Sequence, residues 1–414
     1  MQTCWRMEAC DAASDARAGW LIARDGTDLP TPLFQPVATA GSLRTLDWDD
    51  LWALGYRHVL MNTYHLAVRP GVEEIERSGG VKAFTAWPGS VLTDSGGFQA
   101  FSLASRRTLR PDGIRFTDHA GGARHHFTPR SVLSAQLAFG VDFAMCLDVC
   151  TGLPAPRNRV ARDMALTHAW AVEQAALWPE LLSMAGAPEA GRRHFSAAGD
   201  SAAGTPPLPV SGADSVPPLP PRLFGIAQGG LEEDLRRESI ALIASLSFDG
   251  VALGGLAVGE PREDFHHMAA LCGPLLPSER VRYLLGVGEP ADLLFAVAHG
   301  FDLFDCVQPT RLARHGTAYT SAGKLHLRHA IFSGDARPLD AGCRCRVCRT
   351  YSRAYLRHLF VLHEHSFARL LTLHNLAFYR ALLSRARRRI IAGTYGKWWE
   401  KQYALVDRVV PEGL

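Results

Sequence analysis

Eight short apolar runs recur along the chain, and this repeat limits the possible folds more than any other feature. Each run ends in polar or glycine-rich residues, and most are followed by apolar residues at helical spacing. Eight strand–helix units are the number that closes a (β/α)8 barrel, so we predict an α/β TIM barrel, with an open doubly wound sheet as the alternative. The runs are LFQPVAT (33–39), HVLMNTYH (58–65), SVLTDSGGFQ (90–99), VDFAMCLDVC (141–150), LFGIAQGG (223–230), GVALGGLAVGE (250–260), RYLLGVGEP (282–290) and FDLFDCVQPTR (301–311).

Polar side chains stand where these runs end. In a (β/α)8 barrel the loops after the strands form the active-site face, so the polar residues should converge there. Carboxylates beside apolar strand ends are costly to bury without partners, and three at one mouth indicate acid–base or nucleophilic chemistry. Each Asp could instead be a helix N-cap. The residues concerned are Asp94, Asp148, Gln228, Gly254, Gly255 and Asp305.

Three of the nine cysteines lie within six residues, in CRCRVC (343–348). The other six are scattered, so a disulfide framework is not indicated, and clustered thiols in a reducing compartment usually bind metal. Cys343, Cys345 and Cys348 supply three soft ligands, and tetrahedral zinc needs a fourth. We expect one structural zinc ion in a small subdomain near the C-terminus. His374, inside a helical pattern, is the first candidate for the fourth ligand, followed by His363 or His365.

The chain has 414 residues, 47% of them hydrophobic, which is enough for one large core with a satellite. We expect a disordered leader at 1–18, a catalytic barrel at 19–403 and a tail at 404–414. Residues 178–221 are rich in Ala, Gly, Ser and Pro and form an expected low-complexity surface insertion. The zinc-binding subdomain is expected at 325–380.

The charge distribution favours a phosphate-rich partner. The net charge is only +3, but basic residues crowd the C-terminal region, including RARRR (385–389). A solvated helix face is the alternative interpretation of that run. There is no secretory signal pattern and no stretch of about 18 apolar residues, so we expect a cytoplasmic protein without membrane spans.

Several motifs in one order resemble the tRNA-guanine transglycosylases, also called queuine tRNA-ribosyltransferases, of the bacterial type. The resemblance runs from about residue 20 to about residue 403, interrupted by the insertion. It rests on the following motifs: NTYHL (62–66), LTDSGGFQ (92–99), GGLAVGE (254–260), YLLGVG (283–288), FDCVQPTR (304–311) and CRCRVC with His374.

The resemblance implies a (β/α)8 barrel with zinc bound by three Cys and one His, here Cys343, Cys345, Cys348 and His374. It implies exchange of the wobble guanine in tRNAs with a GUN anticodon for a 7-deazaguanine base. Asp305 matches the nucleophile of a covalent ribosyl–enzyme intermediate, and Asp94 the general acid–base. Other positions match binding residues: Phe98, Asp148, Gln228, Gly255, Leu256 and Glu260 for the base, and Arg311 and Arg314 for the anticodon loop.

Two departures from the bacterial pattern bear on the substrate. Val149 stands where a Glu helps a peptide to switch between bases, and Glu289 replaces a Lys near the tRNA path. Val258 and Cys150 resemble the pattern that takes 7-aminomethyl-7-deazaguanine (preQ1), since queuine-using relatives have Gly at the Val258 position. We therefore expect preQ1, with queuine as the alternative, and a homodimer as in relatives.

Three other functions would account for parts of this pattern. A non-catalytic tRNA-binding partner subunit keeps the zinc site but lacks the carboxylates, whereas Asp94, Asp148 and Asp305 are all present. A related enzyme acting on another base or on DNA is a second alternative, and the extra RNA-binding domains of archaeal members have no counterpart here. A zinc-stapled barrel with unrelated chemistry does not account for the order of the motifs.

Overall fold

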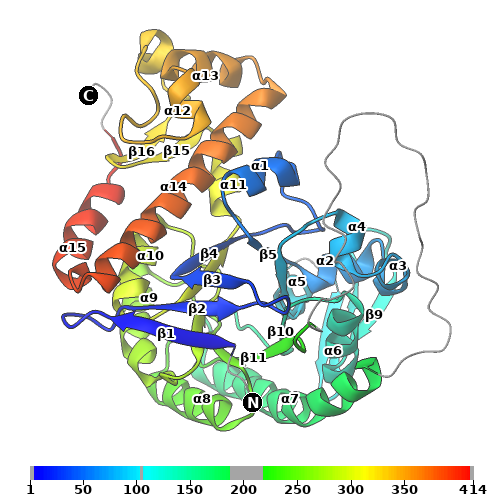
Figure 1. The fold of residues 1–414 in the computed structure, drawn as a ribbon. Helices are drawn as coiled ribbons and strands as arrows, with labels where there is room; N and C mark the ends of the chain where they lie inside the picture. The colour runs from blue at the N-terminus through cyan, green and yellow to red at the C-terminus, as the bar shows by residue number, and fades with distance from the viewer. Residues whose placement is uncertain (1–3, 103–105, 187–217, 411–414) are drawn as a thin grey trace.

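The computed structural model describes residues 4–102, 106–186 and 218–410. Its centre is a closed sheet of eight parallel strands, each paired with the next along the chain (Figure 1). The last strand pairs with the first, and a bridge between Val37 and Leu60 closes the ring. The predicted (β/α)8 barrel is confirmed. Its strands are β4 (Leu33–Pro36), β5 (His58–Met61), β6 (Ser90–Thr93), β10 (Phe143–Met145), β11 (Arg222–Ala227), β12 (Gly250–Leu253), β13 (Val281–Leu284) and β14 (Leu303–Cys306).

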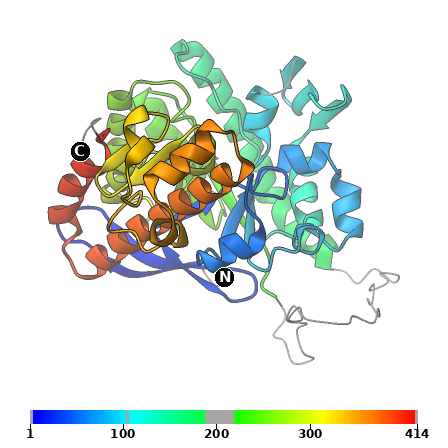
Figure 2. The same ribbon diagram turned by 90° about the horizontal axis from the view of Figure 1, so that it is seen from above.

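The barrel strands coincide with the eight apolar runs. Every residue of β5, β6, β12 and β13 is buried, as expected for parallel strands that are covered on both faces. Helices follow the strands and surround the sheet (Figure 2). They are α1 (Trp48–Ala53), α2 (Thr63–Val68), α3 (Val72–Arg77), α4 (Val81–Thr85), α5 (Gly97–Ser102), α6 (Pro129–Ala138), α7 (Arg157–Gly186), α8 (Glu233–Ser245), α9 (Arg262–Cys272), α10 (Pro290–Ala298) and α11 (Gln308–Arg314).

The expected leader at 1–18 is ordered where the structure describes it. A three-stranded antiparallel sheet forms from β1 (Trp5–Cys10), β2 (Arg17–Ile22) and β3 (Asp28–Thr31). Trp5 is buried beneath the Arg17 guanidinium, which pairs at 2.8 Å with Asp302, the residue directly before β14. This anchoring is non-local, so the local composition of residues 1–18 could not predict it.

Two further boundaries differ from the expectations. Helix α7 continues to Gly186 because Trp178 and Leu181 are buried against the core, while 187–217 of the expected insertion lie outside the described residues. The expected tail begins inside α15 (Tyr395–Val406), and Val409 forms a bridge with Lys324. Residues 411–414 are not described. No helix in the described ranges has the length and apolar character needed to cross a membrane.

A second three-stranded antiparallel sheet lies between β6 and α6, and the sequence did not predict it. It consists of β7 (Arg106–Arg110), β8 (Gly113–Thr117) and β9 (Arg124–Phe127). Phe116 and Phe127 pack from it against Tyr64 and Trp170 in a small core of their own. Its strands are rich in arginine, so the apolar alternation that marks a strand is weak.

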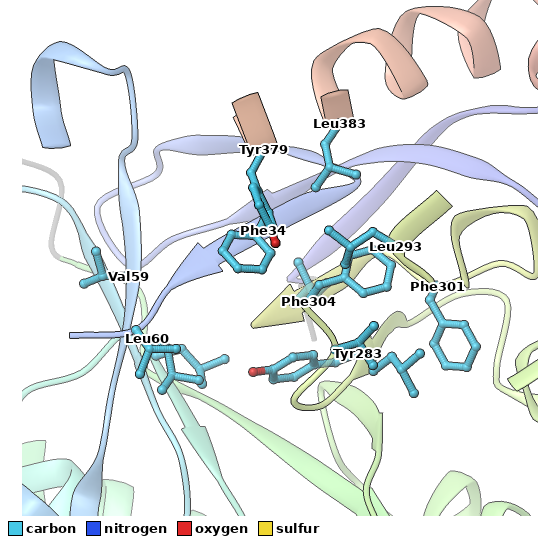
Figure 3. Packing of buried hydrophobic residues seen from close by; sticks show 14 of the residues in the cluster. Phe34, Val59, Leu60, Tyr283, Leu293, Phe301, Phe304, Tyr379 and Leu383 are labelled. Carbon is cyan, nitrogen blue, oxygen red and sulfur yellow. The ribbon is translucent and has the colours of Figure 1, made fainter. Parts of the chain in front are cut away.

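The C-terminal subdomain begins earlier than the expected residue 325. It contains β15 (Thr317–Thr320), β16 (Gly323–His326), the 3-10 helix η2 (Ala330–Gly334), α12 (Arg346–Thr350) and α13 (Arg353–Val361). The long helix α14 (His365–Ile391) runs from this subdomain back across the barrel (Figure 1). There the side chains of Tyr379 and Leu383 point toward Phe34 of β4 (Figure 3). The Phe34 and Tyr379 ring centroids lie 4.7 Å apart. One helix therefore fixes the subdomain to the barrel.

Candidate active site

The carboxyl ends of the barrel strands bring the predicted acidic and amide residues together. Asp94 directly follows β6, Asp148 follows β10, Gln228 follows β11, and Asp305 lies within β14. Parallel strands in a closed barrel direct these ends to one mouth. The observed topology therefore brings these four residues to the same end of the barrel.

Asp94 sits in a cage of hydrogen-bond donors. Its carboxylate accepts hydrogen bonds from the side chains of Asn62 (2.5 Å) and Gln99 (2.8 Å) and from the backbone of Thr63 (2.9 Å) and Gly96 (3.1 Å). Burial nevertheless raises the pKa of Asp94 to about 6, and the charge of Asp305 adds to this effect. A carboxyl group with such a pKa can both donate and accept a proton near neutral pH. Asn62 and Gln99 were not predicted as site residues, although both lie inside the quoted motifs.

Asp305 is held through one of its two oxygens. The Tyr283 hydroxyl donates to Oδ1 at 2.6 Å, and the Gly286 amide donates to the same atom at 3.0 Å. Burial raises the pKa of Asp305, although both hydrogen bonds lower it. Sequence reasoning missed Tyr283; its signal was a single hydroxyl-bearing residue in an otherwise aliphatic run.

Asp148 and Gln228 form the second polar centre of the mouth. The Gln228 amide donates to Asp148 at 2.6 Å, and the Ser95 hydroxyl donates to the other carboxylate oxygen at 3.1 Å. Burial raises the pKa of Asp148 to about 6. A Cβ atom on Gly254 would lie 2.6 Å from the Gln228 amide nitrogen, and one on Gly255 would lie 2.3 Å from the amide oxygen. The paired glycines therefore make room for the Gln228 side chain.

The loop after β12 is braced from both sides. Arg236 of α8 is fully buried and donates to the carbonyls of Gly254 (2.7 Å) and Gly255 (3.1 Å). Glu260 accepts hydrogen bonds from the amides of Ala257 (2.5 Å) and Val258 (3.0 Å). Because N–H and C=O point in opposite directions in a trans peptide, the carbonyl of the residue before Ala257 points away from Glu260. Arg236 was not predicted as a site residue.

The remaining predicted residues lie nearer the surface. Phe98 on α5 is 45% exposed. Arg311 on α11 is exposed, and Arg314 on the same helix is half-buried and donates to the Thr310 carbonyl at 3.0 Å. Val149, beside Asp148, is buried in the small core that contains Tyr64 and Trp170, and is therefore packed against apolar groups.

The predicted metal ligands form one cluster. The ligand atoms of Cys343, Cys345, Cys348 and His374 lie within 4.8 Å of one another. His374 Nδ1 lies 3.2 Å from the Cys348 sulfur, while Nε2 lies 2.8 Å from the Tyr319 carbonyl. That carbonyl accepts only, so Nε2 carries the proton and Nδ1 is left with a lone pair for a metal. The donor set and geometry therefore fit a tetrahedral metal ion. His363 and His365 do not belong to the cluster.

The fold and the site together define a (β/α)8-barrel enzyme with acidic residues at its mouth and an appended Cys3His subdomain. The family model described as queuine tRNA-ribosyltransferase matches residues 10–407. Relatives of that name come from Nitratidesulfovibrio vulgaris (41% identical over 95% of both chains), Symbiobacterium thermophilum (39%, 95% of this chain and 89% of the relative) and Koribacter versatilis (41%, 95% of both). The chain belongs to the queuine tRNA-ribosyltransferase family, and it is a pentosyltransferase of the tRNA-guanine transglycosylase type.

Proposed function

We propose that this protein exchanges the wobble guanine of tRNAs with a GUN anticodon for preQ1, through a covalent aspartyl-ribosyl intermediate. The observation that carries the proposal is the pair of carboxyl groups at one mouth, held in different ways. Asp94 is caged by donors and has a pKa of about 6, whereas Asp305 is bonded through Oδ1 alone among the hydrogen bonds of the described residues. Two carboxyl groups in such distinct environments suit separate acid–base and nucleophilic roles.

Asp305 is the nucleophile. With Tyr283 and Gly286 both donating to Oδ1, Oδ2 is the oxygen that attacks the anomeric carbon of the ribose. Guanine leaves as the Oδ2–carbon bond forms, and the incoming base displaces Asp305 in the second step. Two inversions at one carbon give the retained configuration that exchange at a nucleoside requires.

Asp94 is the general acid–base. In its neutral form it protonates the departing guanine, and the resulting carboxylate accepts a proton from the incoming base. Its pKa of about 6 makes both steps accessible near neutral pH. Burial raises the pKa of Asp94 and the charge of Asp305 adds to this effect, so the proton on Asp94 is favoured while Asp305 is ionised.

Asp148 and Gln228 bind the edge of the purine. A guanine-like base presents a ring N–H and an exocyclic amine, both donors, which a carboxylate can accept. Ser95 and Gln228 keep Asp148 in place for this contact. The backbone at Gly255 and Leu256 completes the edge, and the exposed ring of Phe98 stacks on the base. The flipped target base is thus held by polar and stacking contacts.

The orientation of the loop at Glu260 supports preQ1 as the incoming base. Since the Ala257 and Val258 amides face Glu260, the Leu256 carbonyl points away from this carboxylate. A carbonyl turned toward the base would accept a hydrogen bond from the aminomethyl group of preQ1. Glu260 fixes this orientation without the Glu that relatives carry at the Val149 position. Val258 occupies space that the larger ring of queuine needs.

The Cys3His cluster holds one structural zinc ion, and the C-terminal region binds tRNA. Four protein ligands leave no open coordination position, so zinc supplies folding free energy to the subdomain instead of chemistry.

Arg311 and Arg314 contact the anticodon loop as it presents its base to Asp305. The enzyme acts as a homodimer, the assembly that the family resemblance implies.

A base-exchange assay tests the proposal. Purified enzyme is incubated with guanine, preQ1 or queuine and a GUN-anticodon tRNA that carries a radiolabel in its wobble guanine. Release of the label from the tRNA is followed. We expect rapid exchange with guanine and preQ1 and little with queuine. Asp305→Asn should abolish exchange while tRNA binding is retained. In wild-type enzyme trapped during turnover, analysis of proteolytic peptides should locate a covalent adduct on Asp305. Unchanged exchange in Asp305→Asn would overturn the assignment.

A further inference from the structure

A line of buried polar side chains leads through the barrel interior to Asp305. His58 Nδ1 lies 2.7 Å from the Ser90 hydroxyl, and His58 Nε2 lies 2.7 Å from the Gln35 side-chain oxygen. The Gln35 amide faces the Tyr283 hydroxyl, which donates to Asp305 at 2.6 Å. Ser90, His58, Gln35 and Tyr283 are each at most 2% exposed. Together with Asp305, these four residues form a row of five polar side chains.

The strand register places these residues side by side. His58 and Ser90 are register partners on β5 and β6, and Gln35 and Asp305 are register partners on β4 and β14. The bridge between Val37 and Leu60 sets β4 beside β5 with the same offset, so Gln35 lies beside His58. Residues paired in this way share one face of the sheet. Tyr283 lies on β13, the neighbour of β14, so five consecutive strands contribute to one continuous row.

The hydrogen-bond directions along this row are consistent. The Gln35 oxygen can only accept, so the His58 proton sits on Nε2 and Nδ1 accepts from Ser90. The opposite Gln35 amide orientation would place its oxygen against a Tyr283 oxygen whose proton is already donated to Asp305. Burial and the nearby charge of Lys82 lower the pKa of His58 to about 3, so the imidazole stays neutral. Every donor in the row then points toward Asp305.

Gln35 carries one hydrogen-bonding group that the fold does not use. It is fully buried, yet its amide nitrogen makes no well-formed hydrogen bond to a described residue. A buried unpaired donor is costly and rare, and it is retained where it serves a site. The Gln35 amide is placed to donate a hydrogen bond to the Tyr283 oxygen while the Tyr283 hydroxyl donates its own hydrogen bond to Asp305. Donors linked in series strengthen one another.

We propose that Gln35 and His58 are positioning residues that hold the Tyr283 hydroxyl against Asp305 Oδ1 and thereby aim Oδ2 at the ribose. This inference rests on the proposed role of Asp305 as the nucleophile. Neither residue touches the substrate. Their contribution is the orientation and ionisation of the Asp305 carboxylate during the first displacement.

The test uses the double variant Gln35→Met/His58→Leu, which replaces both hydrogen-bonding partners by apolar groups of similar size and so avoids leaving one of them unpaired. We expect kcat for guanine exchange to fall about fivefold to tenfold with KM for tRNA unchanged. Tyr56→Phe, which removes a buried hydrogen bond to the Leu376 carbonyl away from the mouth, is the matched control and should leave kcat unchanged.

The pH profile gives a second readout that a purely structural role would not move. A weaker hydrogen bond from Tyr283 raises the pKa of Asp305, so the acid limb of kcat/KM should move to higher pH by about half a unit. The titratable groups that face Asp305 are Asp94, Tyr283 and Cys306, and all three are unchanged in the variant.

A double-mutant cycle with Tyr283→Phe completes the test. If Gln35 and His58 act through Tyr283, the double variant should have little further effect on kcat in the Tyr283→Phe background. A full-sized further loss, or an unchanged kcat and pH profile in the double variant alone, would overturn the inference. Gln35→Met alone permits the same comparison should the double variant not fold.

These outcomes are separable from the failure of the proposed function. Exchange that survives in Asp305→Asn would remove the nucleophile itself. Loss of exchange in Asp305→Asn, combined with a silent Gln35→Met/His58→Leu variant, would leave the function intact and reject only the positioning role.

Discussion

Glu289 Oε2 lies 2.9 Å from Lys324 Nζ, an ion pair that joins the barrel to the Cys3His subdomain. Glu289 belongs to the loop after β13, and Lys324 belongs to β16. The Gln308 amide and the Tyr319 hydroxyl also donate to this carboxylate. The sequence suggested that Glu289 reverses a charge on the tRNA path. The structure shows that this charge is instead paired within the protein.

Breaking this pair should weaken the junction. In Glu289→Lys two half-buried cations face each other, and we expect the free energy of unfolding to fall by about 1–3 kcal/mol. The exchanged pair Glu289→Lys/Lys324→Glu should recover most of the loss. Chemical denaturation monitored by circular dichroism measures both. Equal stability of the single and exchanged variants would show that the pair does not stabilise the junction.

The ionisation of Asp94 should make stability depend on pH. Its pKa is raised from 3.8 to about 6, so the stability contributed by the neutral group is complete below about pH 4 and is lost as the pH rises through 6. Between pH 4 and pH 7 the wild type should therefore lose up to about 3 kcal/mol relative to Asp94→Asn.

Urea titrations of both proteins at pH 4 and pH 7 measure this difference. A stability gap that stays constant between the two pH values would show that Asp94 titrates near its ordinary value. In that case its assignment as the proton donor for guanine would lose its physical basis.

Removal of the metal should affect the subdomain more than the barrel. We expect one zinc ion per chain in the wild type and none in Cys345→Ser, with faster amide hydrogen exchange in α12 and α13. Exchange protection in β11–β13 should persist because the barrel has its own core. Cys10→Ser, which alters an exposed cysteine outside the cluster, is the matched control and should retain the metal. A metal-free wild type with the same protection pattern would contradict this prediction.

Arg311 should contribute to tRNA affinity through phosphate contact. The side chain is exposed on α11, the helix that directly follows the strand of Asp305. We expect Arg311→Ala to weaken binding of all GUN-anticodon tRNAs alike and to reduce the slope of log K against log salt by about 0.7–0.9. Fluorescence anisotropy at several salt concentrations measures the slope. Arg237→Ala on α8 is a control of equal charge change. An unchanged slope in Arg311→Ala would place this residue outside the tRNA contact.

The barrel was predictable because its evidence is repetitive. Each buried parallel strand is a short apolar run with a polar end, and the order of strands in space follows the chain. The metal cluster was predictable for a related reason: three of its ligands lie within CRCRVC. The fourth, His374, could not be chosen over His363 and His365 by spacing alone.

Features that depend on distant contacts were not predictable. The N-terminal sheet is fixed by the ion pair of Arg17 with Asp302, 285 residues further along the chain, and local composition carries no sign of that contact. Tyr283 and Arg236 act on groups brought near them only by the closed barrel. The partner of Glu289 was likewise hidden, because Lys324 follows it on another element of the fold.

The pairing of β14 with β4 has a consequence for the synthesis of this enzyme. Gln35 emerges from the ribosome early and Asp305 late, and the pairing of their strands can form only once both have emerged. A nascent or prematurely terminated chain that ends before β14 thus lacks both the closed barrel and Asp305, the nucleophile that we propose. If Asp305 is the nucleophile, such a fragment cannot begin to cleave a cellular tRNA and then leave the reaction unfinished.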